Sequence, residues 1–86
     1  MSVVFGCVIG ADRKPIKGAS VMFVRGPVAL PDIALITDAA GEFALTAPVD
    51  GIYTVLVNAQ GFPSVERQVR VSGKASTSID IIVGGK

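Results

Sequence analysis

The chain has 86 residues and a mass of 8.8 kDa, which is enough for one domain with a thin core. Half of the residues are apolar and 17% are charged, so a disordered polar linker is excluded. The net charge of +1 gives no electrostatic footprint for nucleic acid or an anionic membrane. The chain contains no histidine and a single cysteine, which removes the commonest general base and excludes a disulfide within one chain. We therefore expect a noncatalytic protein with no cofactor and no metal site.

Targeting signals are weak. The apolar run at residues 3–9 follows no lysine or arginine and breaks at residues 10–12, unlike a signal peptide. No run approaches the roughly 18 apolar residues that a membrane-spanning helix needs, so we expect no membrane insertion. The compartment stays open, and we expect residues 1–86 to form a single domain with a frayed end at residues 84–86.

Short apolar runs alternate with turn residues along the whole chain, and none recurs at helical spacing. The pattern predicts seven strands, at residues 2–10, 19–25, 33–37, 42–46, 52–59, 65–71 and 77–83. Charged, proline- or glycine-containing turns separate them, at residues 12–15, 26–27, 38–41, 48–51, 60–63 and 72–74. Strands at this spacing are typical of an all-β sandwich.

Alternation along each strand predicts which side chains face the core, because successive strand residues point to opposite sides. The predicted core consists of Val4, Val8, Val21, Phe23, Ile36, Phe43, Leu45, Tyr53, Val55, Val57, Val71, Ile79 and Ile81. Tyr53 follows a glycine turn, where its ring can fill the core while its hydroxyl holds the preceding loop.

Four segments together resemble the carboxypeptidase regulatory-like domain. These are VFGCV at residues 4–8 with PIKGASV at 15–21, TDAAGEF at 37–43, GIYTV at 51–55 and AQGF at 59–62. The resemblance covers nearly the whole chain in the right order. It implies a transthyretin-like (prealbumin-like) Greek-key β-sandwich of about seven strands, related to Cna-B-type domains.

Domains that resemble this family are commonly noncatalytic accessory modules, often in bacterial surface or secretion proteins, where they space other domains or bind partners. The matched turn residues have structural interpretations. Glycines supply positive φ or backbone room, an aspartate caps its turn, and the tyrosine holds a loop. These residues are Gly18, Asp38, Gly41, Gly51, Tyr53 and Gly61. The histidine-dependent hydrolysis of some transthyretin relatives cannot be carried over to a chain without histidine.

Several strands are apolar at both alternating sets of positions, which is typical of burial on both sides. The outward apolar residues are Phe5, Cys7, Ile9, Met22, Val24, Ile52 and Leu56, and the apolar loop adds Val28 and Leu30. If the first, second and fifth strands are neighbours, these residues form one apolar sheet face that packs against a second copy or a larger protein. Two alternatives remain: the faces are misassigned by one residue, or the loop at residues 26–31 covers the face.

A second function also stays open, namely a carbohydrate- or peptide-binding accessory module of a cell-surface or secreted protein. Such a module normally presents exposed aromatic rings, and only Phe62 and Phe5 are candidates. A hydrolase would need a convergent acid–base pair, which the sequence does not offer.

Overall fold

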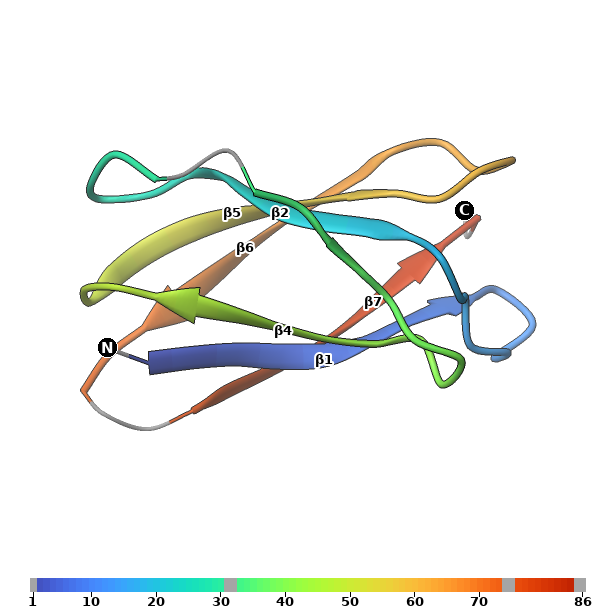
Figure 1. The fold of residues 1–86 in the computed structure, drawn as a ribbon, viewed down its shortest axis with the longest axis horizontal. Helices are drawn as coiled ribbons and strands as arrows, with labels where there is room; N and C mark the ends of the chain where they lie inside the picture. The colour runs from blue at the N-terminus through green and yellow to red at the C-terminus, as the bar shows by residue number, and fades with distance from the viewer. Residues whose placement is uncertain (1, 31–32, 74–75, 85–86) are drawn as a thin grey trace.

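A computed structural model describes residues 2–30, 33–73 and 76–84, and these form seven strands with no helix (Figure 1). The two-sheet β-sandwich that the sequence predicts is confirmed. The strands are β1 (Ser2–Gly10), β2 (Ser20–Arg25), β3 (Leu35–Ile36), β4 (Glu42–Ala47), β5 (Gly51–Asn58), β6 (Val65–Val71) and β7 (Thr77–Val83). Gly85 and Lys86 of the predicted frayed end lie outside the described residues.

The strands form one sheet in the order β4-β1-β7 and a second in the order β3-β2-β5-β6. In the first sheet β1 pairs antiparallel with β4 and parallel with β7, while every pairing in the second sheet is antiparallel. Figure 1 shows the two sheets as separate layers, with β1 at the centre of one and β2 and β5 in the other. Each layer therefore has one side toward the core and one side away from it.

The core lies between the sheets and is built mainly from valine, as expected of β-branched residues on a pleated surface. Of the predicted core residues, eleven are buried: Val4, Val8, Val21, Phe23, Phe43, Leu45, Tyr53, Val55, Val57, Val71 and Ile81. Ile79 is half-buried and packs against them. Five further residues complete the core: Ala19, Ala47, Ala59, Val69 and Val83.

The prediction that Ile36 belongs to the core is wrong, because its side chain is 63% exposed. The third strand is only two residues long, against the five that the sequence predicts. Ile36 pairs with Ser20 and so shares its outward side, while Leu35 pairs with the buried Val21 and faces inward. Two apolar neighbours on a short edge strand give no alternation from which to choose the inward one.

Gly6 allows β1 to take its central place between β4 and β7. A Cβ atom added at this position would overlap the backbone carbonyl of Ile79, which is its partner on β7. A side chain here would push the two parallel strands apart, so the close approach needs glycine.

Tyr53 anchors the end of the sandwich where β4 turns into β5. Its ring is fully buried and packs on Phe23, with ring centroids 4.6 Å apart. Its hydroxyl donates to the carbonyl oxygen of Val49 at 2.6 Å and accepts from the Val49 N–H at 3.2 Å. One side chain therefore fills the core and closes the preceding turn.

We expect Tyr53→Phe to keep the ring packing but to lower the free energy of unfolding by about 1–2 kcal/mol, because both backbone groups of Val49 lose their partner. For a domain of this size each kcal/mol corresponds to a fall in Tm of about 4–8 °C. Thermal and urea unfolding followed by circular dichroism measure the change. Ser64→Ala is the control, since its hydroxyl bonds only to Asn58 on the exposed surface. An equal loss in the two variants would contradict the assignment.

Candidate interaction surfaces

The predicted interface residues are divided between the two opposite outer sides of the sandwich. β1 lies in one sheet, whereas β2 and β5 lie in the other, so the prediction of one face shared by the three strands is wrong. We call the outer side of the β4-β1-β7 sheet the β1 face, and the outer side of the β3-β2-β5-β6 sheet the β5 face. The reason for the difference is a crossover of the chain between sheets after β1, which alternation cannot reveal.

The β1 face carries an apolar row along its central strand. Phe5 is 42% exposed, while Cys7 and Ile9 are half-buried by their neighbours. The parallel register sets Ile82 of β7, which is 45% exposed, directly beside Ile9. Val3 extends the row at the other end of β1.

Two carboxylates stand on either side of this row. The register places Glu42 of β4 and Asp80 of β7 opposite Cys7, one on each flanking strand. Together with Asp38 they line a shallow hollow of about 560 Å³ over Phe5 and Cys7. The β1 face is thus apolar along its middle and acidic at its sides.

This environment makes the Cys7 thiol a poor nucleophile. Burial raises the pKa of Cys7, and the negative charges of Glu42, Asp80 and Asp38 raise it further, because all of these disfavour the thiolate. The thiol donates a weak hydrogen bond to the carbonyl oxygen of Ala40 at 3.7 Å. Reactivity depends on the thiolate, so Cys7 stays largely protonated at neutral pH.

We predict that Glu42→Gln combined with Asp80→Asn lowers the pKa of Cys7 and therefore increases its thiolate fraction at pH 8. Alkylation by iodoacetamide should become about two- to tenfold faster. The rate is measured against pH, and the whole profile should move to lower pH. Asp12→Asn, in the β1–β2 turn, is the matched control and should leave the profile unchanged. An unchanged rate in the double variant would mean that the carboxylates do not act on the thiol.

The β5 face carries its own apolar residues on β2 and β5. Met22 lies opposite Leu56 across the two strands, and both are half-buried. Ile52, further along β5, is 50% exposed. Val24 lies at a register irregularity of β2 and is also exposed. The outward Ile36 continues this face toward β3.

Arginines flank the apolar residues of the β5 face. Arg25 of β2 lies opposite Thr54, and Arg70 of β6 lies opposite Ile52. Thr54 is buried although it points away from the core, so the side chains around it cover the middle of β5. Glu66 of β6 stands opposite Leu56 and is the one acidic residue on the described strands of this face.

The apolar loop after β2 runs beside β2, with Leu30 toward the core, and it is not part of the β1 face. Val28 is exposed, whereas Leu30 packs partly on the core. Together with Met22 and Val24 they line a hollow of about 550 Å³. The structure therefore brings four of the predicted interface residues together here. Pro31, the last residue of the predicted loop, lies outside the described residues.

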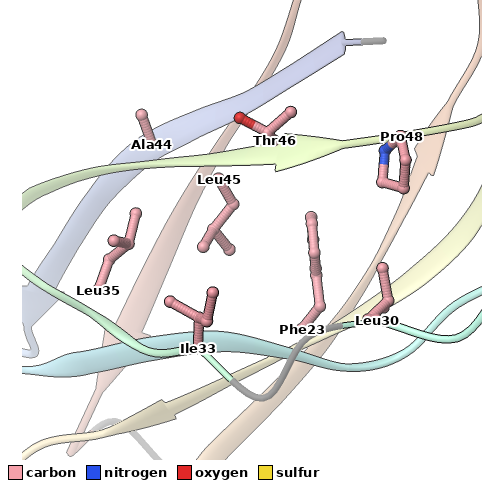
Figure 2. Close-up of a pocket in the computed structure, with 8 residues that line it drawn as sticks. All are labelled: Phe23, Leu30, Ile33, Leu35, Ala44, Leu45, Thr46 and Pro48. Carbon is pink, nitrogen blue, oxygen red and sulfur yellow. The ribbon is translucent and has the colours of Figure 1, made fainter.

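A third surface, which the sequence did not predict, is an apolar cleft of about 370 Å³ between the edges of the two sheets. Figure 2 shows Phe23, Ile33 and Leu35 on one side pointing toward Leu45 on the other. Leu30 and Pro48 close one end (Figure 2). Recognising this cleft from the sequence would require knowing that Leu30, Ile33 and Leu35 lie opposite β4.

The edge of β4 beside this cleft is only partly capped. The Val8 N–H donates to the carbonyl oxygen of Gly41, so by antiparallel alternation the backbone groups of Ala44 and Thr46 point away from β1. The backbone N–H and carbonyl of Glu42 also point away from β1, but both have hydrogen-bond partners on Asp38. Asp38 Oδ1 accepts from the Glu42 N–H, and the Asp38 N–H donates to the Glu42 carbonyl oxygen. The open part of the edge therefore lies next to the apolar cleft.

The predicted turn residues have the following environments. Asp38 Oδ1 also accepts from the Ala40 N–H at 2.9 Å, which closes the turn before β4. All four glycines among the predicted turn residues have positive φ: Gly18, Gly41, Gly51 and Gly61. Thr37, which the prediction did not single out, is buried and joins two segments. Its hydroxyl donates to the Ile16 carbonyl at 2.7 Å and accepts from the Ala19 N–H at 2.9 Å.

Aromatic rings do not gather at a surface site in the described ranges. Phe23 and Tyr53 form a close aromatic pair, but this pair lies in the core. Phe62 is in the β5–β6 turn with its ring over Gly84, whereas Phe5 is on the β1 face. The two candidates for a carbohydrate platform are thus not brought into one site.

Within the part of the chain that the structure describes, no three histidine, cysteine or acidic side chains are grouped so as to hold a metal ion. The same part has no helix long and apolar enough to cross a membrane.

The sequence pattern of the carboxypeptidase regulatory-like domain matches residues 3–84, so the chain belongs to this family. No protein of curated function matches the chain.

Solved structures share the fold at low sequence identity. The major pilin subunit BcpA of Bacillus cereus superimposes with a TM-score of 0.79 at 15% identity, over 95% of this chain and 28% of the pilin. The dioxygenase domain of a dioxygenase–carbohydrate-binding protein fusion from Streptomyces gives 0.72 at 19% identity, over 94% of this chain and 77% of that one. The Caf1A usher C-terminal domain gives 0.59 at 18% identity, over 96% of this chain and 99% of that one.

The chain thus spans about a quarter of the pilin but nearly the whole of the usher domain. At these identities the likeness concerns the fold, which carries pilin, enzyme and usher domains alike. Function must therefore be argued from the surfaces of this chain.

Proposed function

We propose that this chain is a noncatalytic protein-interaction module that packs through its apolar outer sheet faces against a second copy or a larger protein. The observation that carries the proposal is the exposure of Phe5, Ile82 and Ile52 on the outer sides of both sheets. Burial of such a side chain against a partner is worth about 1.5–3 kcal/mol, which the isolated domain does not gain.

The chemistry of the side chains supports a noncatalytic role. The chain has no histidine, and its single cysteine sits among carboxylates that raise the pKa of the thiol. The residue type most often used as a general base is therefore missing, and the one thiol is not activated as a nucleophile. The Streptomyces dioxygenase domain has a similar fold, so the fold itself does not exclude catalysis, and the noncatalytic role is inferred only from the side chains of this chain.

The usher comparison gives further support. Conserved hydrophobic clusters on the surface of the Caf1A usher C-terminal domain are important for F1 antigen assembly. We infer a comparable use for the exposed apolar residues here, because isolated apolar side chains are common on surfaces but rows along central strands are a mark of interfaces.

A photoreactive phenylalanine analogue at position 5 or position 52 tests the proposal in the organism that encodes the chain. We expect crosslinks to protein from both positions, and far fewer from position 49, which is exposed to a similar degree but lies in the β4–β5 turn. Mass spectrometry identifies the attached protein, whether it is the same chain or another. Equal crosslinking at all three positions would contradict an interface on the sheet faces.

A second function, peptide binding, is favoured by the cleft beside β4. An extended peptide could pair with the outward backbone groups of Ala44 and Thr46 and insert alternate side chains between Ile33 and Leu45, as in β-strand addition. The apolar lining and the absence of an aromatic platform in the described residues favour a peptide over a carbohydrate.

Peptide and glycan libraries screened in parallel separate these ligands. We expect apolar peptides to bind and Ile33→Ser to weaken them by about tenfold or more, since one apolar contact is lost. Ile33 is largely exposed, so the variant should remain folded. Ile82→Ser, on the β1 face, is the control and should bind as the original chain does. Binding of glycans alone, or peptide binding that Ile33→Ser does not change, would rule out the cleft as a peptide site.

A further inference from the structure

The two outer faces share one plan but carry opposite charge. In each, an apolar central strand is flanked by charged residues on its two neighbours. On the β1 face these are Glu42 and Asp80, on either side of Cys7. On the β5 face they are Arg25 and Arg70, on either side of β5. All four charged side chains are exposed.

The spacing of the charges is also matched. Neighbouring strands are about 4.8 Å apart, so two charges on strands that flank a common central strand are separated by roughly 10 Å across the sheet. This holds for Glu42 and Asp80 across β1 and for Arg25 and Arg70 across β5. The arginines are offset by two residues along β5, because one lies opposite Thr54 and the other opposite Ile52. The length and flexibility of arginine side chains can accommodate this offset.

Only contact between a β1 face and a β5 face brings the carboxylates opposite the arginines. Two β1 faces brought together would oppose carboxylates to carboxylates around Phe5, and two β5 faces would oppose arginines to arginines. A β1 face against a β5 face instead pairs both carboxylates with both arginines and buries Phe5 and Ile82 against Ile52 and Leu56. Glu66 is the exception on the β5 face, and it lies at the Leu56 end, beyond the row of Arg70 and Ile52.

We propose that copies of this chain stack head to tail, with the β1 face of one copy on the β5 face of the next. This inference rests on the proposed function and adds the occupant and its orientation. The two faces lie on opposite sides of the sandwich. A stack of any length therefore has a free β1 face at one end and a free β5 face at the other, and each can bind a further copy. Such a heterologous contact continues in a linear series unless its rotation closes a ring.

Complementary charge reversals test the stacking directly. Asp80→Arg alters only the β1 face, and Arg70→Glu alters only the β5 face. Sedimentation equilibrium from about 1 µM to about 1 mM covers the range of weak to moderate association. We expect the original chain to form a concentration-dependent series of oligomers that weakens with added salt. Each single variant should associate at least about tenfold more weakly, because a like-charge contact replaces an attractive one.

An equimolar mixture of the two variants gives the decisive result. The original β5 face of Asp80→Arg should bind the original β1 face of Arg70→Glu, and the two altered faces again carry opposite charges at the reversed positions. The expected result is that the mixture recovers the association that each variant alone has lost, with the two variants present in equal amounts in the oligomers. Lys17→Glu, at the exposed tip after β1, makes the same change in charge as Arg70→Glu and should assemble like the original chain. Circular dichroism establishes that each variant is folded.

Three outcomes would overturn the stacking. They are an original chain that stays monomeric throughout the range, a single variant that still associates as the original does, or a mixture that associates no more strongly than each variant alone. The crosslinking experiment above then separates the two proposals. Crosslinks from positions 5 and 52 to a different protein would leave the sheet faces as interfaces for that protein, whereas their absence would remove the proposed function as well.

Discussion

The structure depends on one constraint: a sandwich of two sheets gives each strand a single core-facing side. Alternation of side chains then commits every second residue of a strand to the outer surface, whatever its polarity. In β1 the inward residues are Val4 and Val8 and the outward ones include Phe5 and Cys7. An apolar side chain at an outward position therefore cannot pack into the core between the sheets. It can be buried only if another segment or another molecule covers the outer side of the sheet.

Much of the remaining architecture serves to hold the two sheets in place at their ends and edges. Tyr53 closes the β4–β5 turn from inside the core, and Thr37 joins the segment before β4 to the one before β2. Asp38 caps the first outward backbone pair of β4, which leaves only the part of that edge beside the apolar cleft open. Most of these contacts use a side chain to satisfy backbone groups in turns, since a short chain has few core residues to contribute.

The electrostatic character of the outer faces arises from pairing between strands that are distant in sequence. Glu42 and Asp80 are 38 positions apart, yet both stand beside Cys7 because β4 and β7 flank β1. The same grouping that raises the pKa of the Cys7 thiol gives the β1 face its negative charge. On the opposite side Arg25 and Arg70 flank β5 in a similar way. These two unlike faces on one small domain are the basis of the stacking proposed above.

The number of strands, the family and nearly all of the core can be predicted from the amino-acid sequence, because they follow from local alternation and from turn residues such as Asp38 and Gly41. The inward side of the long strands can be predicted too, whereas that of the two-residue β3 cannot, which is why the prediction for Ile36 is wrong. Tertiary structure alone decided which strands are neighbours. Because β1 and β2 lie in different sheets, Phe5 and Met22 are on opposite sides of the molecule. Strand pairing also places the charged residues beside the apolar rows and forms the cleft beside β4. The physical reason is that side-chain direction repeats every two residues along a strand, while register and sheet membership arise from pairing between remote segments.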